Sequence, residues 1–294
     1  MAQTDNAATH AGATWLVVNS ASGSASEKAI AEVKAALTAT GRAPQRIIDC
    51  QKDDLPDIAA LTAGLVDMVV SYAGDGTTGA LVAPLDGWRG RVLVLPGGTQ
   101  NLLARALHRD RTMPDIIAQL GTNRLKAVRR TCLRGAGHVA LAEVLAGPGA
   151  MWSDVREGMR GGLLGGDLGE VARRTLEAVR QSAGGPKVTL EDCPACRPEG
   201  YAGIRLSPLS DALQAEGYGA ESVADYLAQG LALLRRDFRE GPHDDLGRFE
   251  AVVCRSLEGA PVELMIDGER ATAGPAARFL LAPLAVDLLA AGDG

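Results

Sequence analysis

The chain has 294 residues, of which 46% are hydrophobic and 22% are charged, a composition typical of a soluble globular protein. Its net charge of −6 argues against a nucleic-acid-binding protein, because such proteins gain much of their affinity by neutralising phosphates. The length exceeds that of a usual single core and predicts two domains.

The sequence predicts a cytoplasmic protein. No apolar run approaches the roughly 18 residues that would span a bilayer. Residues 1–14 lack the basic and apolar regions of a signal peptide, and we expect a disordered tail there. The five cysteines form no secreted disulfide pattern, and the C-x-x-C pair Cys193 and Cys196 is expected in an exposed loop, since zinc sites need about four ligands.

The first half alternates strands and helices. Strands are expected at 15–19, 46–49, 68–72 and 92–95. Helices are expected from a capping box at Ser24 and Glu27 to Gly41, and then at 55–65, 77–85, 101–107 and 113–120. This alternation predicts a parallel sheet covered on both faces, with ligands bound at the carboxyl ends of the strands.

The second half is expected to be mostly antiparallel β structure with helical insertions. Its predicted strands are 125–133, 138–145, 187–190, 201–206, 249–255, 262–266 and 278–281. Two helices are expected at 167–182 and 223–238, and flexible segments at 158–169, 192–200 and 239–247. The predicted domains are 15–124 and 125–294, and the last strand could return to the first domain.

The most informative stretch is 69–78, Val-Val-Ser-Tyr-Ala-Gly-Asp-Gly-Thr-Thr. A β-branched run ends there in a small-residue turn, and a helix follows at once. Such a turn and the positive end of the helix dipole can bind phosphate. The one acid in the turn, Asp75, would repel the anion directly, so it is expected to hold Mg²⁺ or to accept a proton from an attacking hydroxyl. Gly-Asp-Gly also makes ordinary turns.

Three further stretches of the sequence accompany this one. Two of them repeat its pattern of a strand followed by a turn, and the third lies near the C-terminus. Residues 15–23 and 91–101 each place a strand before a turn of small residues, and residues 266–269 read Ile-Asp-Gly-Glu. Together the four resemble the patterns N-P-x-S-G, G-G-D-G-T, L-P-x-G-T-x-N and D-G-E. These are typical of the diacylglycerol kinase catalytic domain family, which includes sphingosine, ceramide and bacterial lipid kinases. The resemblance covers about residues 15–286.

The resemblance implies an N-terminal α/β domain of the NAD kinase and diacylglycerol kinase type, followed by an antiparallel β-sandwich. It implies an ATP-dependent lipid kinase that uses Mg²⁺ and acts on a lipid hydroxyl, with transient contact to the membrane surface. The oligomeric state, a homodimer included, stays open. Nucleotide is expected between the domains, with the acyl chains in an apolar pocket of the second domain.

The resemblance also assigns roles to individual residues. Asp75 and Glu269 would be catalytic, and Asp75 and Asp267 would bind the metal. The residues implied for ATP binding are Asn19, Ser22, Gly23, Gly74, Gly76, Thr77, Gly98, Thr99 and Asn101. Taken alone, Asp267-Gly268 is also a favoured pair for a type I′ hairpin turn.

The sequence departs from the family pattern at several positions. Ser20 replaces the proline of the first motif and Ala73 the first glycine of the second. Gly79 stands where the family usually has an acid, and the acid expected in the second domain is not evident, with Asp154 as one candidate.

Two alternatives therefore stay open. An NAD kinase shares the glycine turn but would need an Asn-Glu pair that is not found around residues 123–143. The second alternative is a catalytically weak relative that binds nucleotide or lipid and regulates another process. Gly79, at the position of the missing acid, motivates it.

Overall fold

The computed structural model describes residues 12–21, 26–98, 100–148, 185–219 and 243–292, and the structural statements below concern these residues. The chain divides into two compact units, Met1–Arg130 with Leu284–Gly294, and Thr131–Pro283. The boundary lies a few residues beyond the position expected from sequence. The last strand begins in the second unit and ends in the first.

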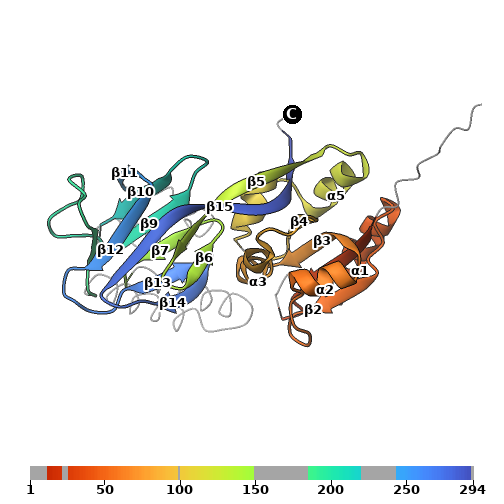
Figure 1. Cartoon of the computed structure of the whole chain (residues 1–294), viewed down its shortest axis with the longest axis horizontal. Coiled ribbons are helices and arrows are strands. Elements are labelled where there is room, and N and C mark those ends of the chain that lie inside the picture. The colour runs from red at the N-terminus through yellow and green to blue at the C-terminus, as the bar shows by residue number, and fades with distance from the viewer. Residues whose placement is uncertain (1–11, 22–25, 99, 149–184, 220–242, 293–294) are drawn as a thin grey trace, which may run out of the picture. The chain divides into compact units, whose positions relative to one another are not determined.

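The first unit is built on a parallel sheet (Figure 1). Its strands lie in the order β2 (Arg46–Asp49), β1 (Ala13–Val18), β3 (Val66–Ala73) and β4 (Arg91–Pro96). The end of β15 (Ala276–Ala291) then pairs in parallel with β4 through Asp287 and Leu288. The predicted α/β architecture is confirmed.

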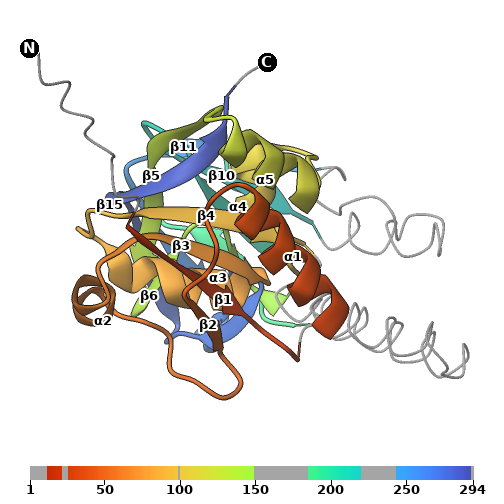
Figure 2. The ribbon, with the colours of Figure 1, turned by 90° about the vertical axis from the view of Figure 1, so that its right-hand side faces the viewer.

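Helices cover both faces of this sheet because β1, β3 and β4 are apolar at nearly every position. Figure 2 shows α1 (Glu27–Ala39) and α5 (Met113–Gly121) on one side of the strands and α2 (Ile58–Ala63) on the other. One core cluster joins Leu16, Met68 and Leu93 of the strands to Val33 of α1 and Ile116 of α5.

The remaining helices of the first unit follow β3 and β4. After β3 come α3 (Asp75–Val82) and the short 3₁₀ helix η1 (Ala83–Leu85), and after β4 comes α4 (Leu102–His108). Each of these connections leaves the sheet at the carboxyl end of its strand.

Two helix starts differ from the prediction. The N-cap of α1 is Ser26, whose hydroxyl accepts the N–H of Ala29 at 3.2 Å, so the expected capping box at Ser24 is wrong. α2 begins at Ile58, because the carboxylate of Asp57 accepts the N–H of Ala60 at 2.7 Å. Asp57 thus caps the helix that was expected to begin near Pro56.

The second unit is antiparallel, as predicted. A six-stranded sheet has the order β11 (Asp244–Phe249), β10 (Leu213–Tyr218), β9 (Gly203–Pro208), β7 (Val144–Ala146), β13 (Glu263–Ile266) and β14 (Glu269–Thr272). A further group pairs β8 (Val188–Leu190), β12 (Ala251–Ser256) and the first part of β15. β5 (Leu125–Gly135) enters this unit from the first and pairs with β6 (His138–Ala140).

The second unit also corrects several sequence predictions. The strand expected at 138–145 is divided into β6 and β7, and β10 and β14 were not predicted. The segment 239–247, expected to be flexible, contains the first residues of β11. The helices expected at 167–182 and 223–238, the flexible segment 158–169 and Asp154 lie outside the described residues.

Candidate active site

The loop after β3 forms the start of α3. Gly74 is the N-cap in an extended conformation, and Asp75, Gly76 and Thr77 form the first turn of the helix. The N–H groups of Gly76 and Thr77 have no acceptor within the helix and lie at the positive end of its dipole. A buried hydrogen bond of 2.9 Å between the hydroxyls of Thr78 and Ser71 ties this helix to its own strand. The arrangement suits an anion.

The loop after β4 lies directly against the loop after β3. A Cβ on Gly97 would stand 2.5 Å from the nitrogen of Ala73, and a Cβ on Gly98 would stand 2.5 Å from the Cα of Gly74. Real Cβ atoms do not approach backbone this closely. Both glycines are therefore required by the contact between the two loops, and the two sequence motifs form one structure.

Asn101 closes the second loop. Its backbone is left-handed, with a φ of 51°, a conformation that asparagine tolerates better than most residues. Its side-chain oxygen accepts the N–H of Gly98 at 2.7 Å, and its amide donates to the carbonyl of Gly98 at 2.9 Å. Asn101 therefore shapes the loop that the sequence motif assigned to nucleotide binding.

Asp75 connects the two loops. One of its carboxylate oxygens accepts the N–H of Leu103, in the first turn of α4, at 3.2 Å. A carboxylate can accept about four hydrogen bonds, so this side chain can hold the N–H and still take a metal ion or a proton. The position of Asp75 is thus fixed by the backbone of the neighbouring motif.

Asn19 brings the end of β1 to the same place. Its amide donates to the hydroxyl of Thr77 at 3.1 Å, and its oxygen accepts the N–H of Ala21 and the side-chain amide of Gln51, each at 3.1 Å. The structure therefore joins Asn19, Gly74, Asp75, Thr77, Gly98 and Asn101 through direct contacts. Ser22, Gly23 and Thr99 lie outside the described residues.

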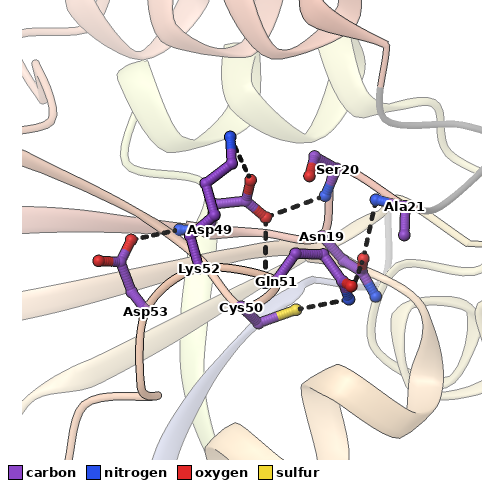
Figure 3. Close-up of polar contacts among 8 residues, drawn as sticks. All are labelled: Asn19, Ser20, Ala21, Asp49, Cys50, Gln51, Lys52 and Asp53. Atoms are coloured by element: carbon purple, nitrogen blue, oxygen red, sulfur yellow. Dashed lines mark hydrogen bonds and ion pairs between the residues drawn. The ribbon is translucent and has the colours of Figure 1, made fainter.

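The turn after β2 supports the first loop and was missed from sequence (Figure 3). The carboxylate of Asp49 accepts the N–H of Ser20 at 3.2 Å and that of Gln51 at 3.3 Å, and it pairs with Lys52. Hydrogen bonds from Ser20, with smaller contributions from Gln51 and Lys52, lower the pKa of Asp49 to about 2. The signal in the sequence that could have identified Asp49 was its position at the end of a predicted strand.

The fourth motif, in the second unit, forms a hairpin. Asp267 and Gly268 join β13 to β14 with positive φ values of 47° and 90°, as a type I′ turn requires. The buried carboxylate of Asp267 accepts three N–H groups, from Leu141 at 2.6 Å, Ala142 at 2.8 Å and Glu143 at 2.9 Å.

These contacts give Asp267 a structural role: it holds the connection between β6 and β7. Glu269 is the exposed first residue of β14, at the edge of the six-stranded sheet. The roles implied for Asp267 as a metal ligand and for Glu269 as a catalytic acid or base stay predictions.

Within the described part of the chain, no three His, Cys, Asp or Glu side chains are placed to hold a metal ion together. Mg²⁺ in phosphate sites often uses only one or two carboxylates and takes its remaining ligands from phosphates and water. Asp75 beside the start of α3 fits that pattern. Gly79, at the family's usual acid position, lies within α3 and supplies no ligand.

Residues 13–132 match a known family model. The match is to the diacylglycerol kinase catalytic domain. It contains the three strand-and-turn motifs of the first unit, and it confirms the resemblance seen in the sequence. The match supports a kinase-type function.

Solved structures show the same fold along nearly the whole chain. A diacylglycerol kinase from Bacillus anthracis str. Sterne is 12% identical, with a TM-score of 0.58 over 95% of this chain and 97% of that one. A putative diacylglycerol kinase from the same organism is 15% identical, with a TM-score of 0.60 over the same shares. No curated protein matches the chain. None of the described helices is long and apolar enough to cross a membrane.

Proposed function

We propose that this protein is an ATP-dependent lipid kinase, which transfers the γ-phosphoryl group of Mg-ATP to a hydroxyl of a lipid such as diacylglycerol or a sphingoid base. The observation that carries the proposal is the backbone contact between the Gly74 and Gly98 loops. It places the start of α3, Asp75 and the asparagine-closed loop side by side at the carboxyl ends of β3 and β4. This is where open parallel sheets bind ligands.

In this proposal the backbone of Gly74, Gly76 and Thr77 receives phosphate oxygens, because glycine allows close approach and the helix start supplies N–H groups. Asn19 keeps the Thr77 hydroxyl in position. Mg-ATP, when bound, supplies the phosphoryl group and neutralises its developing charge. Asp75 holds the metal or accepts the proton of the attacking hydroxyl, with its orientation set by the Leu103 N–H.

A cavity of about 420 Å³ in the second unit is our candidate for the apolar part of the lipid. It falls within the usual size range of small-molecule sites. Most of its lining is small or apolar, and Glu263 and Arg270 add charge. The lining residues are Gly147, Pro148, Gly185, Pro186, Val188, Ala260, Pro261, Val262, Glu263 and Arg270.

The proposal is tested by incubating the protein with radiolabelled ATP, Mg²⁺ and four acceptors in turn: diacylglycerol, sphingosine, ceramide and NAD. We expect a labelled lipid and a preference for long-chain over short-chain acceptors with the same head group. Labelled NADP instead would identify an NAD kinase. Binding of ATP by calorimetry without transfer to any acceptor would favour a regulatory nucleotide-binding protein, and absence of ATP and ADP binding would contradict the proposal.

A further inference from the structure

The loop between β8 and β9 brings two thiols together. Cys193 and Cys196 are both half-buried, and their Sγ atoms lie 2.6 Å apart, closer than sulfur atoms that merely pack against each other. The N–H of Cys196 donates to the carbonyl of Cys193 at 3.1 Å, which closes a tight turn around Pro194 and Ala195. The turn itself holds the sulfur atoms in proximity.

The ends of this loop are fixed to the rest of the second unit. On one side, the N–H of Glu191 donates to Val253 of β12 at 3.0 Å, and its side chain forms an ion pair with Arg255. On the other side, the guanidinium of Arg197 forms an ion pair of 2.6 Å with Asp244, at the start of β11. The thiols are therefore carried by an anchored loop.

A further bond holds the Arg197 side of the loop. The hydroxyl of Tyr201 donates to the same carboxylate of Asp244 at 3.0 Å and accepts the N–H of Arg197 at 3.2 Å. The loop expected from sequence to be flexible at 192–200 thus has defined partners beside both cysteines.

The surroundings do not favour a metal. A structural zinc site takes about four ligands, and the described residues contain no group of three His, Cys, Asp or Glu side chains that could hold an ion. Two neighbouring thiols with no third ligand among the described residues are suited to oxidation to a disulfide.

We propose that Cys193 and Cys196 form a redox site, which closes to a disulfide by exchange with a low-molecular-weight disulfide of the glutathione type. The thiolate of one cysteine attacks the external disulfide, forms a mixed disulfide and releases one external thiolate. The other cysteine then attacks the protein sulfur of that mixed disulfide and releases the second. The protein loses two electrons and two protons, and the external disulfide becomes two thiols.

The site should respond to oxidising conditions and be reduced otherwise. Cytoplasmic disulfides are usually transient, because the glutathione pool keeps thiols reduced. Burial, with the hydrogen bond shared with Cys196 and the charge of that residue adding to it, raises the pKa of Cys193 to about 11. Because the thiolate is the reacting species, closure should become faster as the pH rises above neutrality.

The test uses the full chain, incubated natively with reduced and oxidised glutathione at several ratios, alkylated and digested with trypsin. Both cysteines fall in one peptide, residues 188–205, because the bond from Arg197 to Pro198 resists cleavage. In the oxidised samples we expect this peptide to have lost two hydrogens and to escape alkylation, and dithiothreitol should reverse the change. Cys193→Ser and Cys196→Ser should instead retain one glutathione on the remaining thiol.

Cys50 provides the internal control, since it is half-buried and contacts hydroxyl and amide groups rather than a second sulfur. Its peptide should take up glutathione or stay reduced. If the Cys50 peptide becomes glutathionylated while the 188–205 peptide keeps two alkylatable thiols, the proposal is wrong. Stoichiometric zinc in the freshly purified protein that disappears in Cys196→Ser would also overturn it. Neither readout depends on kinase activity.

Discussion

Gly98 has its role because a side chain is absent there. Ala at this position would place its Cβ 2.5 Å from the Cα of Gly74, and backbone cannot yield as a flexible side chain can. The two loops would have to separate, so the contact that assembles the site depends on the absence of a Cβ at Gly98 as well as at Gly97.

We therefore expect Gly98→Ala to lower the free energy of unfolding by about 2 kcal/mol, within the usual range for overpacking, and to weaken ATP binding. Gly274→Ala is the matched control, because a Cβ there would meet nothing within 4 Å and its φ is not in the left-handed region. Denaturant titration and calorimetry measure the two effects. Equal stability and equal ATP affinity in both variants would contradict this account of the loops.

A substitution at Asp75 can separate the catalytic role of its carboxylate from its structural role. Asn at this position keeps an oxygen for the N–H of Leu103 but loses the negative charge. We expect Asp75→Asn to lower kcat by on the order of 10²–10⁴, the usual contribution of a general base, while the melting temperature stays nearly unchanged. Asp110→Asn, at an exposed carboxylate, is the control and should retain activity. Full activity in Asp75→Asn would move the base role to Glu269.

At the scale of elements, the β13–β14 hairpin shows that the two acids of one motif, Asp267 and Glu269, have different environments. Asp267 is buried and holds three backbone N–H groups, whereas Glu269 is exposed on an edge strand. The sequence motif Asp-Gly-Glu does not distinguish them.

We expect Asp267→Ala to destabilise the protein by about 3 kcal/mol or more, because several N–H groups lose their acceptor and each buried unpaired group costs about 1–3 kcal/mol. Glu269→Gln should leave stability and ATP affinity close to wild type and lower turnover, since only a proton or metal contact would be lost. Thermal unfolding and steady-state kinetics of the pair check this. A fully stable Asp267→Ala variant, or unchanged turnover in Glu269→Gln, would refute the corresponding assignment.

At the scale of the whole molecule, His108 links stability to pH. It is fully buried in α4, and desolvation, with the charge of Arg111 adding to it, lowers its pKa from 6.5 to about 4. Its folded form therefore favours the neutral imidazole. The stability from this residue is complete above pH 6.5 and is lost as the pH falls toward 4, because the unfolded chain binds the proton more tightly.

From these two pKa values we expect the wild type to lose about 2 kcal/mol of unfolding free energy between pH 7 and pH 5 through His108 alone. The pKa values of Asp49 and Asp244 are lowered too, but an aspartate with a low pKa loses its contribution at more acidic pH. His108→Gln should flatten the dependence in this window, as measured by urea titration at each pH. An equally steep loss in the variant would show that His108 is not responsible.

The sequence by itself determined those features of the protein that depend on residues adjacent in the chain. Apolar strands such as 92–95 are followed directly by glycine turns and helix starts, so the alternation, the parallel sheet and the ligand-binding edge could be inferred locally. Asp75 was found in this way, as the one acid in the turn before a helix start, whereas the binding role expected of Asn101 came from the family resemblance.

The tertiary structure alone decided which distant groups meet. Asp49 holds Ser20 and Gln51 holds Asn19 only because β2 lies beside β1, and Gly98 matters only because its loop touches Gly74. β11 and β14 were missed because Asp-Asp-Leu-Gly-Arg-Phe and Glu-Arg-Ala-Thr lack an apolar alternation and become strands by pairing with β10 and β13. An antiparallel strand pair is stabilised by contacts between side chains on the two strands, so the energy of the pairing cannot be read from either strand alone.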